Sequence, residues 1–514
     1  MLPHLGVQND EAIFVTPLYH WREAFYTLRI GHSHIPLMLM SYLGALKVWI
    51  YKPIFRLFGA NVWTLREPML LAGAASIWLF FQVLRRVAGE RAAWIGCALL
   101  AVDSMYLLTS CFDWGPVAMQ HLLLAAGILQ LTKFYHEGKN LPLAGGCFLL
   151  GLAMFDKALA VWMLSGIAVA AAATIPRQIW AVITRERVTL AVSAFLFGML
   201  PLIVYNVATH GETFKGNFHP DPREISQKVE ILRLTTEGDG LFGYMVAEKW
   251  QTAHPRLPQG LIQEASARIS ALAGYPRRDL MKYALLLAVL LAPLAGRDAL
   301  RAVLFALIAL AVAWLQMAMT QGAGGSIHHS ILLWPLPQAI VAISFAGVSQ
   351  RLGRAGIPAV ATVVAVLLVS ALLVMNQYYY AMVRNGGAQA WTDAIVPLSD
   401  FLKRAPATNV YCVDWGIFDG LSLLNAGKLP LRVGSSPIDR PELSPDDRQA
   451  VVQMISEPGA VFLTHTKDFE FFQGVNEKLV KFAADAGYRR DMLTVICDGN
   501  QRPTFEVYRF AAEE

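Results

Sequence analysis

The sequence predicts a polytopic α-helical membrane protein with about ten transmembrane helices and a soluble α/β domain at its carboxy terminus. Of the 514 residues, 55% are hydrophobic and only 16% are charged, and the mean hydropathy is +0.43. The surface of a soluble protein of this size does not tolerate so much apolar residue content. The net charge of +5 is modest and the bases are scattered between apolar runs, so nucleic acid is not an expected partner.

Apolar runs long enough to cross a bilayer recur along the first three quarters of the chain. The expected spans lie near 68–87, 92–110, 116–132, 141–155, 158–175, 189–207, 281–296, 300–320, 328–348 and 356–379.

The connectors between these runs alternate in charge, which predicts the topology. Basic residues concentrate in connectors 85–91, 133–139, 177–187, 297–301 and 351–354. By the positive-inside rule these connectors are cytoplasmic, so the others lie on the outer side. The expected organisation is an extracytoplasmic first segment (1–66), a transmembrane domain (67–380) with a long outer loop (209–280), and an extracytoplasmic α/β domain (381–514). The expected location is the cytoplasmic (inner) membrane, with the active site facing outward.

The amino terminus departs from the usual pattern of an outer segment. Residues 1–10 contain neither a signal peptide nor a span, so we expect a helix upstream of Met1. In the alternative, residues 35–51 form a true span, which would put Asp10 in the cytoplasm. We favour an interfacial segment with snorkelling bases, because Lys47, Lys52 and Arg56 interrupt this stretch.

After residue 380, short β-branched runs alternate with polar helical ones, which is typical of a small α/β domain. Strands are expected at 409–414, 429–433, 460–464 and 492–497, and helices at 418–426, 444–455 and 469–486. Ser444 precedes a proline and should cap the second of these helices. Without a phosphate loop or catalytic cluster, the domain is expected to be a lid or an acceptor-docking module.

The five cysteines have no metal-ligand spacing. Cys412 and Cys497 are the one pair that fits a disulfide, provided that their domain is extracytoplasmic.

Acidic residues mark the predicted outer ends of several spans. These are Asp10 with Glu11, Asp113 before Trp114, and Asp156 with Lys157 between two apolar runs. Carboxylates on one face of a membrane domain suggest an active site embedded at the bilayer edge.

In their order along the chain these features resemble a known family. Asp10-Glu11 is followed by the 47–53 stretch, by an acid in the second outer loop, and by a lysine at the end of the next outer turn. This combination is similar to the protein O-mannosyltransferase and aminoarabinose transferase branch of the GT-C glycosyltransferases, over roughly residues 8–350. The resemblance implies a polyprenyl-phosphate sugar as co-substrate. Two departures are the missing first helix and His328-His329, where related enzymes often have an arginine.

The resemblance implies that Asp10 is the catalytic base. Attack on the anomeric carbon of a lipid-linked sugar needs a base for the acceptor's proton and cations for the leaving phosphate. A single carboxylate acting in direct displacement would invert the anomeric centre. In the alternative, Asp10 only caps a helix that starts near Glu11. Asp113 is expected to face sugar hydroxyls or the acceptor, with an amino-terminal cap of the span near Pro116 as its alternative.

Lys157 is the one Lys or Arg in the short outer connectors, so it is the preferred candidate to bind the lipid phosphate. Its alternative role is a local ion pair with Asp156 that marks a turn. Lys47 and Lys52 are weaker phosphate candidates, since interfacial lysines usually only snorkel.

Four further residues complete the expected substrate site. Glu11 would orient Asp10 or the acceptor, Arg256 would steer a phosphate or an acidic acceptor, and His328 or His329 would contact phosphate. A divalent metal ion is optional, with Glu11 and His329 as weak candidate ligands. In the alternative, each of these four residues is only a solvated or hydrogen-bonded side chain without a role in substrate binding. Asp103 lies inside its span, where a carboxylate is functional by default.

The sequence therefore predicts a membrane glycosyltransferase, transferring a hexosyl or pentosyl group to a lipid, glycan or protein acceptor at the outer face. The main alternative is a transporter or lipid flippase, for which internal repeats would be expected. A noncatalytic receptor with a sensing α/β domain is a second alternative.

Overall fold

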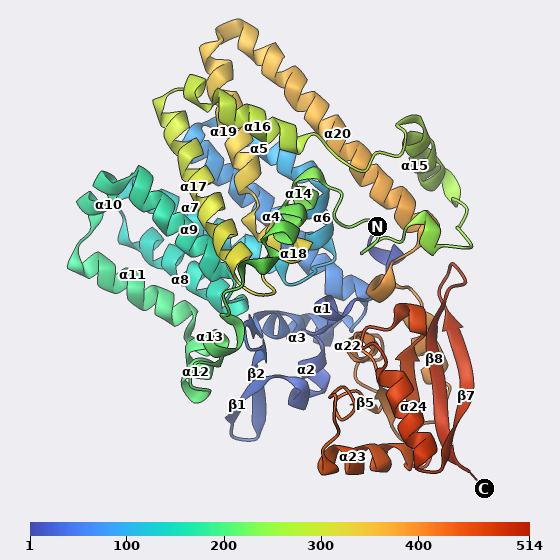
Figure 1. Cartoon of the computed structure of the whole chain (residues 1–514). Coiled ribbons are helices and arrows are strands. Elements are labelled where there is room, and N and C mark those ends of the chain that lie inside the picture. The colour runs from blue at the N-terminus through green and yellow to red at the C-terminus, as the bar shows by residue number, and fades with distance from the viewer. Residues whose placement is uncertain (514) are drawn as a thin grey trace.

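The computed structural model describes residues 1–513. A helical bundle forms one half of the molecule and a sheet-containing carboxy-terminal domain lies beside it, with the amino-terminal segment between the two (Figure 1). Each predicted span corresponds to a helix or to a pair of consecutive helices. The bundle comprises α4 (Val62–Ala88), α5 (Glu90–Val102), α6 (Ser104–Cys111), α7 (Val117–Glu137), α8 (Asn140–Asp156), α9 (Ala160–Thr174), α10 (Pro176–Val182), α11 (Arg185–Gly198), α12 (Leu200–Ala208), α16 (Met281–Leu291), α17 (Arg297–Met319), α18 (Ile327–Ser330), α19 (Leu336–Arg351) and α20 (Gly356–Asn385).

Length and apolarity identify fewer certain crossings than the expected ten. Five helices meet both criteria, and up to eight spans result if each bent pair counts as one. The bent pairs are α5 with α6 (61°), α9 with α10 (99°) and α11 with α12 (69°). Two other predicted spans, α8 and α16, are apolar helices of 17 and 11 residues. The polytopic fold class is confirmed, and the number of crossings stays a prediction.

The basic connectors meet at one end of the bundle. Arg187 donates from Nη2 to the carbonyl of Gly138 at 2.7 Å, which joins two of these connectors. Arg91, in a third basic connector, donates to the hydroxyl of Ser349 at 3.0 Å, just before a fourth connector. This grouping is what the charge alternation predicts, because residues on one side of a membrane lie at one end of its helices.

Small residues allow the helices of the bundle to approach closely. A Cβ at Gly198 of α11 would lie 2.2 Å from the Phe148 carbonyl oxygen of α8, and one at Gly151 would lie 2.1 Å from the carbonyl oxygen of Phe195. Such backbone proximity is how helices associate in lipid, where hydrophobic burial offers no driving force. In the middle of the bundle, α19 is buried on nearly every side.

The amino-terminal segment has more strand than the sequence predicts. It contains α1 (Asn9–Ala12), α2 (Thr16–Tyr19), a three-stranded antiparallel sheet of β1 (Tyr26–Ile30), β2 (Ser33–Met40) and β3 (Leu43–Gly44), and then α3 (Leu46–Phe58). Gly31, with φ of +60°, lies in the two-residue turn of the β1–β2 hairpin. Residues 35–51 are therefore no continuous span, because they are split between strands and α3.

The outer loop contains α13 (Glu212–Asn217), α14 (Ile225–Glu237) and α15 (Gly260–Leu272). The last of these packs against the bundle. Asn376 of α20 donates to the Ser266 carbonyl at 3.1 Å, which fixes α15 against the outer half of α20.

The carboxy-terminal domain is a mixed five-stranded sheet with helices, and its α/β class is confirmed. Strand order is β5-β4-β6-β8-β7, with β5, β4 and β6 parallel and β8 antiparallel to both β6 and β7. Its elements are α21 (Ile395–Leu402), β4 (Val410–Cys412), α22 (Ile417–Leu424), β5 (Leu431–Val433), α23 (Pro445–Ile455), β6 (Val461–His465), α24 (Val475–Asp485), β7 (Tyr488–Cys497) and β8 (Pro503–Ala512).

Three details of this domain test the sequence expectations. Ser444 caps α23 by accepting from the Asp447 amide at 3.1 Å, as predicted. The final strand β8 was not predicted. The expected disulfide is wrong, because Cys412 is buried in β4, Cys497 is exposed at the end of β7, and both are free.

Candidate active site

Asp10 is held in the first turn of α1 with its carboxylate free of the helix. Gln8 is the capping residue: its Oε1 accepts from the Asp10 amide at 2.6 Å, and its own amide donates to Glu11 at 3.0 Å. The Asp10 side chain therefore does not cap α1, which removes the structural alternative for this residue. Instead, Oδ2 of Asp10 accepts a hydrogen bond from Nε1 of Trp114 at 3.0 Å.

The surroundings of Asp10 favour a proton acceptor. Its side chain is half-buried, and burial raises the pKa of the Asp10 carboxyl above its ordinary value. The positive charge of Lys157 and the Trp114 hydrogen bond act against this shift by stabilising the carboxylate. A carboxylate with a raised pKa is a better general base, provided that it is ionised at the working pH.

Asp113 lies beside Trp114 but faces the interior. Its backbone has a φ of +46°, in the left-handed region that non-glycine residues rarely adopt. Oδ2 forms a buried ion pair with Lys47, and Oδ1 accepts from the amide of Ala118 at 3.3 Å near the start of α7. Asp113 thus has the capping role of its alternative interpretation, and both of its oxygens are engaged within the protein.

Lys47 connects three segments of the protein, which are its own helix α3, the Asp113 loop and the segment of Phe14. Its ammonium pairs with Asp113 and lies 3.5 Å from the centroid of the Phe14 ring, just after α1. The side chain is fully buried. Burial lowers the pKa of Lys47, and the neighbouring carboxylates Asp156 and Glu11 oppose that shift. In this structure Lys47 forms an ion pair that fixes α3 against the Asp113 loop, and its expected phosphate contact stays a prediction.

Asp156 and Lys157 have separate partners. Gln120 of α7 donates to Oδ2 of Asp156 at 2.9 Å, whereas Nζ of Lys157 donates to the carbonyl of Gly115 at 2.9 Å. The backbone at Lys157 forms a bridge with Leu43 of β3. The local ion pair is therefore not formed between them, and Lys157 is directed toward the loop that carries Trp114.

Aromatic rings and both histidines surround the Trp114 indole. Tyr244 from the outer loop stacks on Trp114 with centroids 4.6 Å apart, and His328 lies 4.4 Å from it. His329 is 4.2 Å from His328, and its buried Nδ1 has no hydrogen-bond partner in residues 1–513. Gly115, with φ of +71°, leaves room for His328, since a Cβ there would lie 2.5 Å from its ring.

Glu11 is engaged in a clamp that the sequence did not predict. Arg66 of α4 is fully buried and donates to Glu11 at 2.9 and 2.5 Å. The same guanidinium donates to the carbonyls of Gly6 at 2.7 Å and Leu5 at 3.2 Å. The ion pair with Arg66 fixes the segment that carries Asp10, and the expected contact of Glu11 with substrate or metal stays a prediction.

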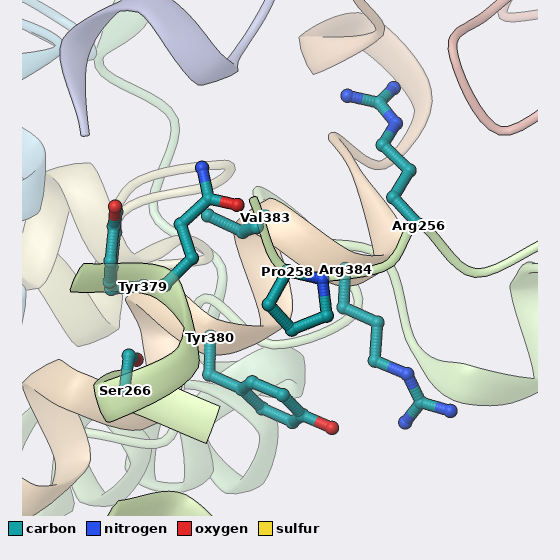
Figure 2. A pocket seen from close by; sticks show the side chains of 8 residues that line it. Arg256, Pro258, Ser266, Tyr379, Tyr380, Val383 and Arg384 are labelled. Carbon is teal, nitrogen blue, oxygen red and sulfur yellow. The ribbon is translucent and has the colours of Figure 1, made fainter. Parts of the chain in front are cut away.

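Two other expected binding residues lie apart from this site. Lys52 is exposed on α3. Arg256 donates to Asp393 at 2.5 Å and links the outer loop to the carboxy-terminal domain. It lines a small pocket between α15 and the end of α20, where its guanidinium and that of Arg384 point in different directions (Figure 2). Lys52 is thus solvated and Arg256 serves as an interdomain link.

Asp103 has a structural explanation. Its oxygens accept from the amide of Tyr106, from Nε1 of Trp334 and from Nε2 of Gln338, each at 2.8 Å. These bonds hold the bend between α5 and α6 against the break that precedes α19.

The optional metal ion has no preformed site of three ligands in the part of the chain that the structure describes. Within 1–513 no three His, Cys, Asp or Glu side chains are grouped to hold a metal ion. Of the two candidate ligands, Glu11 is paired with Arg66.

Three residues of the site were not assigned to it from the sequence. The sequence analysis gave Trp114 no role of its own, although its position next to Asp113 was a usable signal. Arg66 lies just before the expected start of its span at 68, and a buried base at a span edge has a partner by necessity. For Tyr244 the sequence offers no signal, because only the folded outer loop brings it to Trp114.

Known proteins resemble this chain in sequence over one part and in structure over nearly all of it. Residues 45–205 match the family of dolichyl-phosphate-mannose-protein mannosyltransferases. No curated protein sequence matches the chain.

The crystal structure of ArnT from Cupriavidus metallidurans bound to undecaprenyl phosphate is similar over 98% of this chain and 95% of that one, with 11% identity and a TM-score of 0.58. The apo structure of ArnT covers the same shares, with 14% identity and a TM-score of 0.56. The structural similarity establishes a shared fold, but at identities this low it does not establish a shared substrate. The polytopic bundle, the carboxy-terminal domain and these similarities together show that the chain has the GT-C fold of membrane glycosyltransferases.

Proposed function

We propose that this protein is a glycosyltransferase that moves a sugar from a polyprenyl-phosphate donor to an acceptor at the outer face of the inner membrane. The observation that carries this proposal is the half-buried Asp10 carboxylate, which accepts a hydrogen bond from Trp114 at 3.0 Å and is stabilised by the positive charge of Lys157. The fold supports it, and so does the undecaprenyl phosphate in the ArnT structure that shares this fold. That ligand is a polyprenyl phosphate, the leaving group of the proposed reaction.

Asp10 is the proposed base. The nucleophilic atom of the acceptor attacks the anomeric carbon while its proton passes to the Asp10 carboxylate. The bond between that carbon and the phosphate oxygen breaks, and polyprenyl phosphate leaves with the bonding electrons. Because the site requires one displacement only, the product has the inverted anomeric configuration.

Lys157 is the proposed cation for the leaving phosphate. In the structure its ammonium bonds the Gly115 carbonyl, a neutral partner that a phosphate oxygen can replace with a stronger, charge-assisted bond. The free Nδ1 of His329 offers a second contact. Lys47 is not used, since its charge is already paired with Asp113. No step of this mechanism is assigned to a metal ion.

The acceptor is proposed to approach from the carboxy-terminal domain. Gly416, before α22, lies beside Asn9: a Cβ on Gly416 would be 3.9 Å from that of Asn9, the residue before Asp10. An acceptor held by this domain therefore needs to cross only a short distance to the base. A lipid, a glycan and a protein are the classes considered for it.

Mass spectrometry tests the proposal directly. Membrane lipids and surface glycans are compared between cells that carry the wild-type protein, Asp10→Asn or Asp400→Asn. Asp400 is exposed on α21 and is a matched control. We expect one glycoconjugate to lose a sugar in the Asp10→Asn cells, with its polyprenyl-linked donor accumulating, and no change in the control. A modified product that persists at wild-type level in Asp10→Asn cells would contradict the assignment and favour transport or sensing.

A further inference from the structure

A cavity of about 540 Å³ lies in the carboxy-terminal domain, apart from the Asp10 site. Its floor is the edge of the sheet, with Tyr411 from β4 and Val433 from β5. The segment after β5 forms one wall. The other wall is one face of α23, with Asp447, Ala450, Gln453 and Met454, and Glu457 just after this helix. Its size is that of sites which enclose small organic ligands.

Hydrogen bonds organise the walls of this cavity in the absence of any ligand. The hydroxyl of Tyr411 donates to Oε2 of Glu457 at 2.6 Å, and Asn409 donates to Oε1 at 2.6 Å. The segment after β5 is held from outside by Lys478, whose ammonium bonds the Ile438 carbonyl at 3.1 Å. The site is therefore built from β4, β5, the end of α23 and a connecting segment that Lys478 holds in place.

The charges of the cavity are balanced. Nη1 of Arg440 lies 3.3 Å from Oδ2 of Asp447 at the rim of the cavity. Glu457 is the second carboxylate, and Arg432 is the second cation, placed alongside by its 3.2 Å bond to Asn409. Because each cation lies beside a carboxylate, the cavity offers a phosphate or a nucleotide no net attraction, which favours an uncharged ligand.

The remaining chemistry fits a hydroxyl-rich ligand. Planar groups of Arg440, Gln453 and Glu457 offer both donors and acceptors, as paired sugar hydroxyls require. The ring of Tyr411 and the side chains of Met454 and Pro437 supply apolar surface for a pyranose face. Tyr411 is held in place from behind by Phe462, with centroids 5.3 Å apart.

We propose that this cavity binds a neutral or amino sugar, as a glycan site separate from the catalytic one. The proposal does not depend on sugar transfer at Asp10, because it concerns binding by the carboxy-terminal domain of the full chain. Its occupant is the glycan portion of a larger molecule or a free saccharide, and both present the same hydroxyls.

Two substitutions on α23 test the site, each with a matched control on the same helix. Ala450→Trp fills the cavity and Gln453→Ala removes a polar group from its wall. Gln449→Trp and Gln449→Ala are the controls, since Gln449 is exposed on α23 but does not line the cavity. All three positions are solvent-facing, so the four variants should fold, and thermal unfolding of the detergent-solubilised full chain verifies this.

The probe is an immobilised panel of mono- to tetrasaccharides, with neutral, amino and acidic members. We expect at least one neutral or amino member to bind the wild type, with about tenfold weaker binding for Gln453→Ala and no binding for Ala450→Trp. The Gln449 controls and Asp10→Asn should bind as the wild type does. Competition by the free saccharide distinguishes recognition of the sugar alone from recognition of its linked form. Failure of every neutral and amino member to bind, binding of acidic members only, or equal binding by Ala450→Trp would overturn the proposal.

Discussion

The indole of Trp114 donates its Nε1 hydrogen to the carboxylate of Asp10 at 3.0 Å, across more than a hundred residues of sequence. This bond joins the loop before α7 to the first turn of α1. It also stabilises the ionised form of Asp10, against the effect of burial.

Trp114→Phe should therefore shift the pH dependence of sugar transfer. Without the hydrogen bond the pKa of Asp10 rises further, so the acidic limb of the pH–rate profile moves to higher pH. The rate of Trp114→Phe should therefore fall below that of the wild type at pH values on the acidic limb, where less of the Asp10 carboxyl is ionised. Trp391→Phe is the control, because the buried Nε1 of Trp391 has no partner in residues 1–513. A profile that keeps its acidic limb in Trp114→Phe would contradict this role.

Lys157→Met should weaken the use of donor. The KM for the polyprenyl-linked sugar is expected to rise at least about tenfold, because a charge-assisted contact to phosphate is lost. Lys52→Met removes an exposed lysine from the amino-terminal region and should leave KM unchanged. Lys157→Arg keeps the charge and should restore part of the affinity. If Lys52→Met and Lys157→Met behave alike, the phosphate assignment to Lys157 is wrong.

Arg66→Met should destabilise the protein strongly. The substitution leaves the Glu11 carboxylate buried without its cation, and breaking a buried pair from one side costs about 3–5 kcal/mol. The melting temperature in detergent measures this loss. The double variant with Glu11→Gln should recover part of the stability but not all of it, since the carbonyls of Leu5 and Gly6 still lack their donor. Independent, additive effects of the two substitutions would show that the pair is not coupled.

Asp419→Asn should flatten the dependence of stability on pH. Burial raises the pKa of the Asp419 carboxyl to about 6. A folded-state pKa above the unfolded value means that the folded protein binds the proton more tightly, so stability is highest at low pH and falls as pH rises toward about 6. The change from 3.8 to about 6 corresponds to roughly 3 kcal/mol.

Denaturation of the wild type and of both Asp419→Asn and Asp400→Asn between about pH 4 and 7 measures this contribution. The Asn side chain cannot ionise, so this variant should lose the decline between about pH 4 and 6. Asp400→Asn, on the exposed side of α21, should keep it. An unchanged slope in Asp419→Asn would exclude this carboxyl as its origin.

Much of the fold was predictable because membrane solvation leaves a strong sequence signal. Every predicted span is a helix or bent helix pair, since lipid permits few other ways to satisfy the backbone. The bends were not predictable, because they arise where Asp103 or the Thr174–Pro176 step interrupts an apolar run. The β1–β2 hairpin was missed because its residues also read as an interfacial segment.

The candidate site was predicted in part, and its errors have one cause. The sequence marked the acids and lysines of the predicted outer face, and the structure brings Asp10, Asp113, Lys157 and His328 to one end of the bundle. The sequence did not reveal which of these charges neutralise one another. Lys47 pairs with Asp113 and Glu11 with Arg66, and pairing between distant segments depends on packing that no local pattern records.

The segment that carries Asp10 lies between α4, through Arg66, and α22, where Asp419 accepts a hydrogen bond from Thr16. Neither the lipid-embedded half nor the water-exposed half of the molecule holds the base by itself. Deleting the carboxy-terminal domain would thus remove one of the two contacts that hold the segment of the proposed base, so the loss of this domain would also disturb the Asp10 site.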